Sequence, residues 1–331
     1  IDRAEAVIAE ISNKSPNVFY ETGYASALGK PLLLLVEEGY EVPANLRGRV
    51  LIRYAETRPG LHSLDEQLAD AIRSQVTSSV ALLKDMLLAE NPFPAYIVSS
   101  PKYPGPDSRM AGEVCNERTF GDNLGIRGLL SAFGVMFGRG ENVELISAQH
   151  SPPNLVQRPL NLYLIGSSKV NPRTGEVLDM LQGGAEEQWI LGRDPNDDSK
   201  VEDYRVLLSR KTADAEQRYQ ATVEAAAGVA PSGVIFTKDY GILMRGPHPH
   251  HHDRLVMIMA GAHALGTSAA CLAATHPPLI REVARRLRED CQYNLADRTQ
   301  TFWALLRATM SEETEYVLTP KNVAVDSVGL V

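Results

Sequence analysis

Short apolar runs and helical patterns alternate along residues 1–90. Three apolar runs predict strands, at 7–11, 32–36 and 50–54. Residues 15–28 predict a helix that Ser15 caps, with Pro16 at its first position, where the missing N–H costs nothing. A second helix is predicted over 63–88, where apolar residues recur at helical spacing. Continuous apolar strands separated by a helix indicate a parallel sheet that is covered on both faces.

Five prolines between residues 90 and 108 mark a domain boundary near residue 90. We therefore expect two domains, 1–90 and 91–331. Strands of the second domain are predicted at 96–98, 143–147, 161–165, 204–208 and 255–260, and helices at 121–137, 172–181, 213–227, 267–274 and 280–289. Residues 233–237 and 241–245 predict a hairpin that turns at 238–240. Segments 161–181 and 254–275 share the order strand, glycine turn, helix, which suits a doubly wound sheet with ligands at the carboxyl ends of its strands.

Composition limits the classes of protein that this chain belongs to. With 331 residues, about two domains are expected, and 44% apolar with 22% charged residues is ordinary for a globular protein. The net charge of −8 argues against a nucleic-acid or anionic-membrane footprint, so we expect neither partner. Cys115, Cys271 and Cys291 lie far apart and form no disulfide or metal pattern, which favours a reducing, cytoplasmic compartment. We recognise no signal peptide and no membrane-length apolar run.

The segment SNKSPNVFYETGYA, residues 12–25, carries the most informative motif of the chain. Three of its residues share one helical stripe with Leu28, which follows the segment: Asn17, Glu21 and Tyr24. A carboxylate near the carboxyl edge of a sheet can stabilise or trap an oxocarbenium-like sugar centre. For a lone Glu, a plain surface position is the more common interpretation. Gly23 and Ala25 beside it indicate close packing, which moderates that interpretation.

Residues 4–56 resemble TIR-like and nucleoside 2-deoxyribosyltransferase-like domains. The shared pattern is a strand, the motif at 12–25, Gly-Lys-Pro at 29–31 and a further strand, and LRGRVLIRY at 46–54 matches what commonly follows. The resemblance implies a flavodoxin-like parallel sheet. It implies Glu21 as the catalytic carboxylate in cleaving an N-glycosidic bond of a nucleoside, a nucleotide or NAD. With it we assign Ser12, Asn13, Asn17 and Tyr24 to substrate binding.

Two features depart from this family pattern. Glu10 stands where the family often has Asp at the end of the strand. The family's first strand and substrate-binding loop would lie before Ile1 and are absent from this sequence. Three explanations stay open: the protein is longer, a partner supplies the missing part, or the domain is degenerate.

A second motif is the turn from Gly261 to Thr267, which leads from a strand into a helix. Backbone N–H groups and the helix dipole at such a turn can hold an anion such as a phosphate. The spacing resembles a P-loop, but Thr267 replaces the lysine, so we reject nucleotide hydrolysis. Binding a ligand through Gly261 and Gly266 and close helix–strand packing at Ala269 and Ala270 are equally good interpretations.

A third motif follows the strand 161–165 and comprises Gly166, Ser167, Ser168, Lys169 and Asn171. Its hydroxyl, amide and ammonium groups can bind a phosphate or a ribose. The alternative is a polar loop that caps the helix from residue 172. Together with 239–275, the region resembles a Rossmann-like sensor module attached to bacterial effector or regulatory domains. That resemblance implies no catalytic residue here.

Residues 247–253 bring four histidines and an aspartate together. They are nearly consecutive, whereas metal sites usually draw ligands from separate elements, so we interpret them as an exposed loop and expect no metal. Arg245 is a better candidate for an anion contact. His263 is a further candidate, although a satisfied buried histidine is as common. We find no Ser-His-Asp or Cys-His set, and we expect Cys271 to lie in the core.

Two hypotheses of different classes follow. In the first, the chain is an N-glycosidase, an NAD-cleaving effector that a C-terminal nucleotide-sensing domain controls. NAD would be its substrate, no cofactor is expected, and a homo-oligomer would complete the active site. The resemblance is associated with bacterial antiviral defence. In the second, the chain is a non-catalytic nucleotide-binding or assembly module.

Overall fold

A computed structural model describes most of the chain. The described residues are 1, 4, 6–13, 15–27, 32–42, 50–99, 114–137, 143–168, 170–191, 208–212, 214–225, 234–310 and 318–331. Leu28, Lys169 and nearly all of the strand expected at 204–208 lie outside them. The chain divides into unit 1, Ile1–Ala81, and unit 2, Leu82–Val331. The division falls inside a helix, before the proline-rich segment near residue 90, because Met86 and Leu87 pack in the core of unit 2.

Unit 1 contains a parallel sheet of strands in the order β1-β2-β3. Its elements are β1 (Val7–Glu10), α1 (Pro16–Ala27), β2 (Leu32–Glu37), β3 (Val50–Tyr54) and the long α2 (Arg58–Leu87). Ala25 of α1 packs on Leu34 and Val36, so α1 covers one face. Ile8 points to the other face and is 45% exposed. The sheet is therefore not covered on both faces at β1, contrary to the expectation from its apolar strands.

The main sheet of unit 2 has the strand order β14-β13-β11-β12-β6-β4-β5. Its parallel strands are β4 (Ala95–Ser99), β5 (Val143–Ser147), β6 (Asn161–Ile165) and β12 (His251–Gly261). Antiparallel to their neighbours run β10 (Thr222–Ala225), β11 (Val234–His248), β13 (Phe302–Thr309) and β14 (Val323–Leu330). A small antiparallel sheet holds β7 (Gln188–Leu191), β8 (Leu208–Lys211) and β9 (Glu216–Tyr219).

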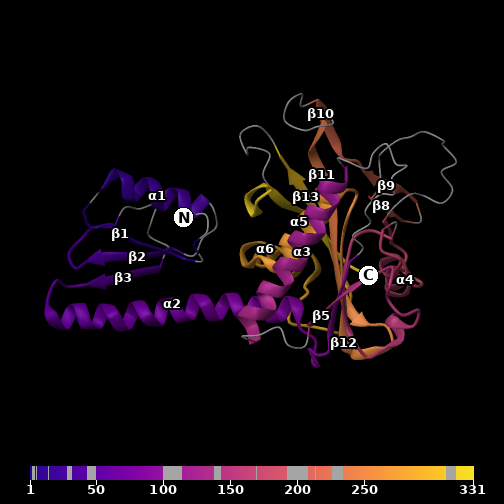
Figure 1. Ribbon diagram of the computed structural model, residues 1–331. Helices are drawn as coiled ribbons and strands as arrows, with labels where there is room; N and C mark the ends of the chain where they lie inside the picture. The colour runs from indigo at the N-terminus through magenta and orange to yellow at the C-terminus, as the bar shows by residue number, and fades with distance from the viewer. Residues whose placement is uncertain are drawn as a thin grey trace. The chain divides into compact units, whose positions relative to one another are not determined.

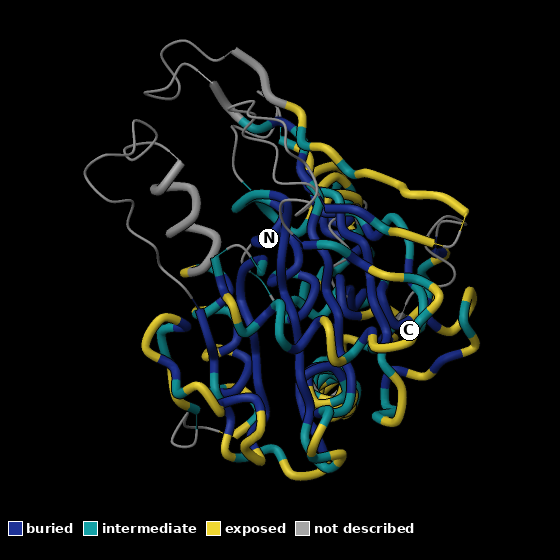
Figure 2. Tube along the Cα trace, turned by 90° about the vertical axis from the view of Figure 1, so that its right-hand side faces the viewer, coloured by how far each residue is buried: buried dark blue, intermediate teal, exposed yellow. Residues whose placement is uncertain are grey.

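Helices lie on both faces of the main sheet (Figure 1). On one face, α3 (Val114–Phe137), α5 (Ala264–Thr275) and α6 (Pro277–Cys291) share a core with the end of α2. On the other face, α4 (Pro172–Leu181) packs with the small sheet and the 3-10 turn Leu155–Gln157. A further 3-10 turn, Pro320–Asn322, precedes β14. Figure 2 shows the strands of the main sheet in dark blue, buried between these layers. Cys271 lies in the first core, as predicted.

Two predicted elements of unit 2 are wrong. The hairpin expected at 238–240 does not exist, because Lys238 and Asp239 pair with Thr309 and Ala308 of β13 and keep β11 extended. The helix expected at 213–227 is replaced by β9 and β10, which pair with β8 and β11. Pairing with a strand that is distant in sequence overrides the local pattern in the first case, and pairing with strands that are near in sequence overrides it in the second.

The fold is mixed α/β, with a parallel sheet in unit 1 and a larger mixed sheet in unit 2. Among the described residues, we find no helix whose length and apolar character would let it cross a membrane.

Candidate functional site

The carboxyl ends of β4 and β6 form a point where the direction of winding changes. From β4 the chain passes to β5 on one side, and from β6 it later reaches β12 on the other side. Helix α3, which follows β4, and helix α4, which follows β6, pack on opposite faces of the sheet. Ligands of open α/β sheets bind in the crevice outside such a point. The loop 166–171 lies here, where the sequence predicts a ligand site.

Asn171 joins the two strand ends at this point. Its side chain is buried, and Nδ2 donates to the carbonyls of Val98 at 3.0 Å and Ile165 at 3.1 Å. Its Oδ1 accepts from the backbone N–H of Arg173 at 3.2 Å, which caps α4. The amide thereby holds the carboxyl ends of β4 and β6 together. Asn171 acts on the chain itself in this structure, as the alternative interpretation of a capped loop predicts.

The described residues between β6 and Asn171 also contact their own chain. Gly166 has a φ of +97°, and a Cβ there would crowd Val170. Its carbonyl accepts from the Thr174 hydroxyl at 2.8 Å. Ser168 Oγ donates to the Leu191 carbonyl at the end of β7. Ser167 is buried, and its carbonyl accepts from two following N–H groups.

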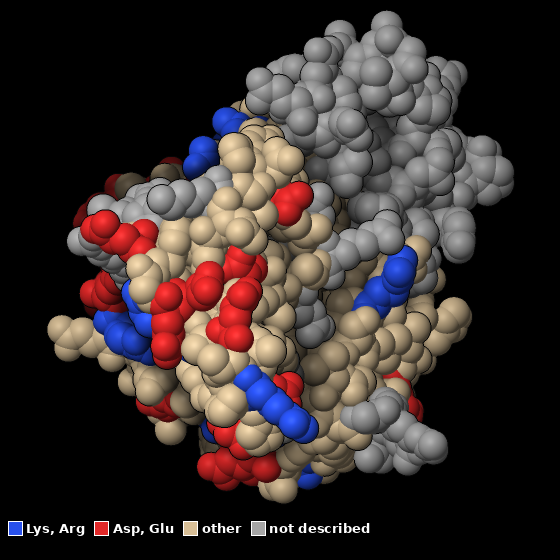
Figure 3. Space-filling view, turned by 90° about the vertical axis from the view of Figure 1, so that its left-hand side faces the viewer, with Lys and Arg blue, Asp and Glu red and all other residues tan. Residues whose placement is uncertain are grey.

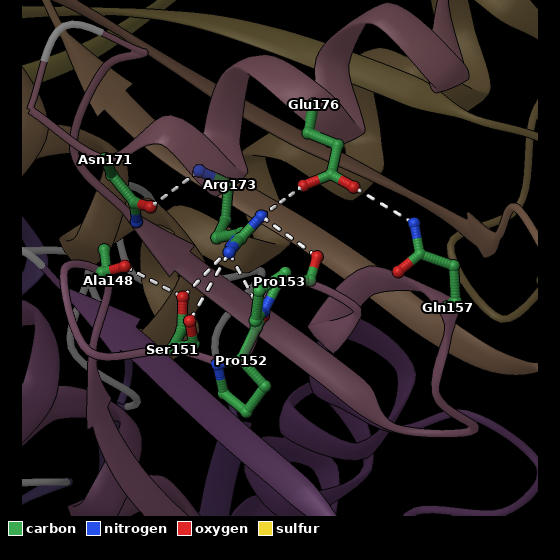
Figure 4. Close-up of polar contacts among 8 residues, drawn as sticks. All are labelled: Ala148, Ser151, Pro152, Pro153, Gln157, Asn171, Arg173 and Glu176. Atoms are coloured by element: carbon green, nitrogen blue, oxygen red, sulfur yellow. Dashed lines mark hydrogen bonds and ion pairs between the residues drawn. The ribbon is translucent and has the colours of Figure 1, made fainter.

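Arg173 anchors the connection between β5 and β6 to helix α4 (Figure 4). Nε donates to Ser151 Oγ at 2.9 Å, and one Nη1 hydrogen donates to Glu176 at 2.8 Å. The remaining three N–H groups donate to backbone carbonyls of Ser151, Pro152 and Pro153 at 3.4, 3.1 and 3.4 Å. All five guanidinium donors are therefore used inside the chain. The sequence prediction missed Arg173, because all of its partners except Glu176 lie about twenty positions away.

The side chain of Asp239, a residue of β11, lies at the start of α5. Its carboxylate is fully buried, and Oδ2 accepts from the backbone N–H groups of Gly266 at 2.6 Å and His263 at 3.2 Å. Oδ1 accepts from the N–H of Tyr240 at 2.9 Å and lies 3.4 Å from Nδ1 of His263. A carboxylate at a helix N-terminus satisfies free N–H groups and complements the helix dipole. From the sequence, the backbone N–H groups of this turn are candidates for binding a phosphate. In the structure, the N–H groups of His263 and Gly266 bind the carboxylate of Asp239 instead.

The glycines of this turn permit close approach of backbone to backbone. A Cβ on Gly266 would overlap the carbonyl of Tyr240, and one on Gly261 would overlap the N–H of Thr267. The Thr267 hydroxyl donates back to the carbonyl of His263 at 3.1 Å. These contacts favour the packing interpretation of the turn. His263 itself keeps a small exposed area, and the ring of Phe236 lies over it with 4.4 Å between ring centroids.

Arg245 lies away from this edge, contrary to the prediction that it ends a hairpin strand. It is in the interior of β11, opposite Met257 of β12, and is only 2% exposed. Its Nη1 donates to the carbonyls of Leu295 at 3.0 Å and Asp297 at 3.3 Å. Burial lowers its pKa. The structure therefore does not bring Arg245 together with the loop 166–171.

The histidine-rich segment is a hairpin tip and the start of a strand, and its expected exposure is wrong for His248. That ring is buried, Nδ1 accepts from the N–H of His250 at 3.1 Å, and burial lowers the pKa to about 4. His251 contacts the carbonyl of Gln157 through Nε2 at 2.9 Å. Within the described ranges, no three His, Cys, Asp or Glu side chains form a metal-binding group.

In unit 1, the predicted stripe is on the exposed side of α1. Asn17, Glu21 and Tyr24 are exposed, whereas Thr22 and Ala25 on the opposite side are buried. The helix begins just after the carboxyl end of β1, so its first turns border that edge.

Ser12 connects the strand ends at the same edge. Its N–H donates to Glu10 Oε1 at 2.8 Å, and its hydroxyl accepts from the N–H of Glu37 at 2.7 Å. Tyr54 ends β3, and burial, followed by the nearby Glu10 carboxylate, raises its pKa. Asn13 is exposed in the turn. Ser12 thus already binds the chain, while Asn13 and the stripe of α1 face solvent.

Comparisons of the chain with family models, with curated proteins and with solved structures found no match. The described surface agrees with the charge balance. On the face drawn in Figure 3, acidic side chains gather in several groups.

Proposed function

We propose that unit 1 cleaves the N-glycosidic bond of NAD or a related nucleotide and that unit 2 controls it by binding a nucleotide. The observation that carries the proposal is the exposed Glu21 carboxylate, which lies between Asn17 and Tyr24 on one face of α1 beside a strand edge. The proposal includes a flavodoxin-like arrangement for unit 1 and a Rossmann-like arrangement for unit 2. Their parallel strands with helical crossovers support it.

The proposed reaction needs one carboxylate and one water molecule. The bond from ribose C1′ to the nicotinamide nitrogen breaks, and its electron pair leaves with the base. Glu21 stabilises the sugar cation or bonds to C1′ as an ester. Water then adds its oxygen to C1′ and releases a proton, which gives ADP-ribose. Asn17 and Tyr24, on the same exposed face, would position the ribose.

Control by unit 2 requires two states with different affinity for the bound nucleotide. The crevice outside β4 and β6 is the proposed place of binding, since the winding direction changes there. Formation of a homo-oligomer on binding would complete the active site. A cytoplasmic location and a role in antiviral defence belong to this proposal.

Nicotinamide release tests the proposal. The full chain is incubated with NAD, with and without added nucleotides, and products are separated by chromatography. Glu21→Gln should lower release by about 10²-fold or more while the protein stays folded. The matched control is Glu66→Gln, because Glu66 lies on α2 with its side chain 70% exposed. Equal release from the Glu21→Gln protein would refute the assignment.

The second candidate is a non-catalytic nucleotide-binding or assembly module. Its support is that apolar side chains are exposed on unit 1, with Ile8 on the sheet face opposite α1 and Tyr20, 77% exposed, on α1. Nucleotide binding without turnover, together with self-association that Ile8→Ser weakens, would favour this module over the enzyme.

A further inference from the structure

An aromatic cluster joins the small sheet of unit 2 to the main sheet. It contains both tryptophans of the chain, Trp189 on β7 and Trp303 on β13, with 4.9 Å between ring centroids. Trp189 stacks on Tyr219 at 5.8 Å, and Tyr219 lies 5.4 Å from Tyr240 on β11. The tryptophans are each 2% exposed, whereas the tyrosines are half-buried. The cluster therefore extends from the core to a surface at which aromatic ring area is accessible.

Two cationic side chains, Arg210 and Lys238, lie beside rings of this cluster. The guanidinium of Arg210 lies 4.8 Å from the Trp303 ring and forms a bidentate pair with Glu187. Lys238 Nζ lies 5.8 Å from the centroid of the Tyr240 ring. Unlike Arg210, Lys238 has no carboxylate within ion-pair distance among the residues that the structure describes. An ammonium beside an accessible aromatic ring suits an anionic ligand that also has a flat aromatic part.

Trp189 adds a second observation. Its indole Nε1 is buried and has no hydrogen-bond acceptor among the described residues. Buried donors without a partner are rare in folded proteins, and each needs an explanation. A buried donor of this kind suits a water molecule as its acceptor, and such a water could join the indole to a ligand at the edge of the cluster.

The aromatic cluster begins at Tyr240, one residue from Asp239, which binds the start of α5. Tyr240 follows Asp239, and its carbonyl accepts from the N–H of Ala262 at the end of β12. Asp239 in turn holds His263 and Gly266. Lys238 and Tyr240 lie on the α4 side of β11, since Tyr240 packs against the core that contains α4. A ligand on this surface would thus lie beside the carboxyl edge of the main sheet.

We propose that Tyr240 and Lys238 form a nucleotide-binding subsite, in which Tyr240 stacks on the base and Lys238 binds the phosphate. The proposal rests on the proposed function, in which unit 2 binds a nucleotide, and it adds a subsite at the start of β11, two strands from β6 along the same carboxyl edge of the sheet. A cationic ligand such as a quaternary ammonium does not fit, because Lys238 would repel it. A bare phosphate fits only half of the subsite.

Tryptophan fluorescence gives a direct test, because both tryptophans belong to this cluster. AMP, adenosine and orthophosphate are titrated into the full chain, with excitation that avoids absorption by the base. AMP should change the emission saturably, adenosine should bind about tenfold more weakly, and orthophosphate at the same concentrations should have no effect. Calorimetry with AMP measures the same affinity independently. No binding of AMP by either method would overturn the proposal.

Matched variants locate the binding. Lys238→Gln should weaken AMP about tenfold and Lys238→Arg should restore it, while Lys211→Gln, at the exposed end of β8, should bind like the parent. Tyr240→Leu should weaken AMP and adenosine alike, whereas Tyr240→Phe keeps the ring and should bind both. Circular dichroism checks each fold. If Tyr240→Leu does not fold, the comparison of Lys238→Gln with Lys238→Arg decides whether the subsite binds AMP.

The outcomes separate this subsite from the catalytic proposal. Unchanged AMP affinity in Lys238→Gln would overturn the subsite even if nicotinamide release still depends on Glu21. AMP binding that depends on Lys238 and Tyr240, without any nicotinamide release, would support the subsite and refute the catalytic assignment.

Discussion

The Oδ2 atom of Asp239 accepts a hydrogen bond of 2.6 Å from the backbone N–H of Gly266. This contact joins the extension of β11 beyond β12 to the first turn of α5. The same carboxylate accepts from His263, so it provides the negative charge that the helix terminus attracts. The backbone N–H groups of His263 and Gly266 are therefore already paired. A ligand at the carboxyl edge of the main sheet would have to bind other groups.

Removing the Asp239 carboxylate should destabilise the protein. Asp239→Ala leaves the buried amide of Gly266 and the part-buried amide of His263 without this acceptor, which costs about 1–3 kcal/mol. Asp239→Asn keeps one acceptor oxygen and should cost less. Urea unfolding measures the difference. An alanine variant as stable as the parent would show that the cap contributes nothing.

Replacing Arg173 by lysine should also destabilise the chain. Lysine has three donors on one nitrogen and cannot reproduce the fork that contacts Ser151, both following prolines and Glu176. We expect a loss of about 1–3 kcal/mol in the free energy of unfolding. Arg281→Lys, at an exposed position of α6, is the matched control and should change stability little. Equal effects of the two substitutions would contradict the proposed anchoring role.

Gly266 tests the close approach of α5 to β11. Gly266→Ala places a methyl group onto the carbonyl of Tyr240, so the helix or the strand must shift, at a cost of about 1–3 kcal/mol. Gly134→Ala in α3 meets no neighbouring atom and should be neutral or stabilising by up to about 1 kcal/mol. Thermal unfolding compares the two. Similar midpoints for both variants would mean that the turn has room.

His248 predicts a pH dependence of stability. Burial, followed by the charges of His251 and His250, lowers its pKa from 6.5 to about 4 in the folded protein. Between these values the unfolded state binds the extra proton, so stability rises with pH through this window and is lost as the pH falls towards 4. The expected slope is about 1.4 kcal/mol per pH unit.

The control for this slope is a second histidine of the same hairpin. His248→Gln should flatten the dependence, and His252→Gln, which replaces an exposed ring, should leave it unchanged. Urea unfolding at a series of pH values measures both. A slope that persists in His248→Gln would assign the titration to another group.

Local patterns predicted the elements that are long, apolar or regularly spaced. The strands 161–165 and 50–54 have the predicted bounds, and α5 and α6 lie where predicted. In these segments, burial of apolar side chains and the local period point to the same structure. The exposed side of α1 also follows from spacing, since Thr22 and Ala25 alternate with Glu21 and Tyr24 at helical intervals.

The groups that organise the candidate site could not be found in this way. Lys238 to Gly241 has the composition of a turn, yet pairing with β13 keeps it extended and brings Asp239 to α5. Arg173 is one of several arginines on predicted helices, and its partners lie in the preceding connection. Both roles depend on contacts between segments that are distant in sequence, which periodicity does not contain.

The most direct measurement compares nicotinamide release by the parent chain and by Glu21→Gln, with a nucleotide added to bind unit 2. NAD is supplied, and nicotinamide is measured over time with and without AMP. We predict release from the parent that responds to AMP, loss of release in Glu21→Gln, and unchanged AMP binding in that variant. Folded parent protein that binds AMP and leaves NAD intact would contradict the proposed activity.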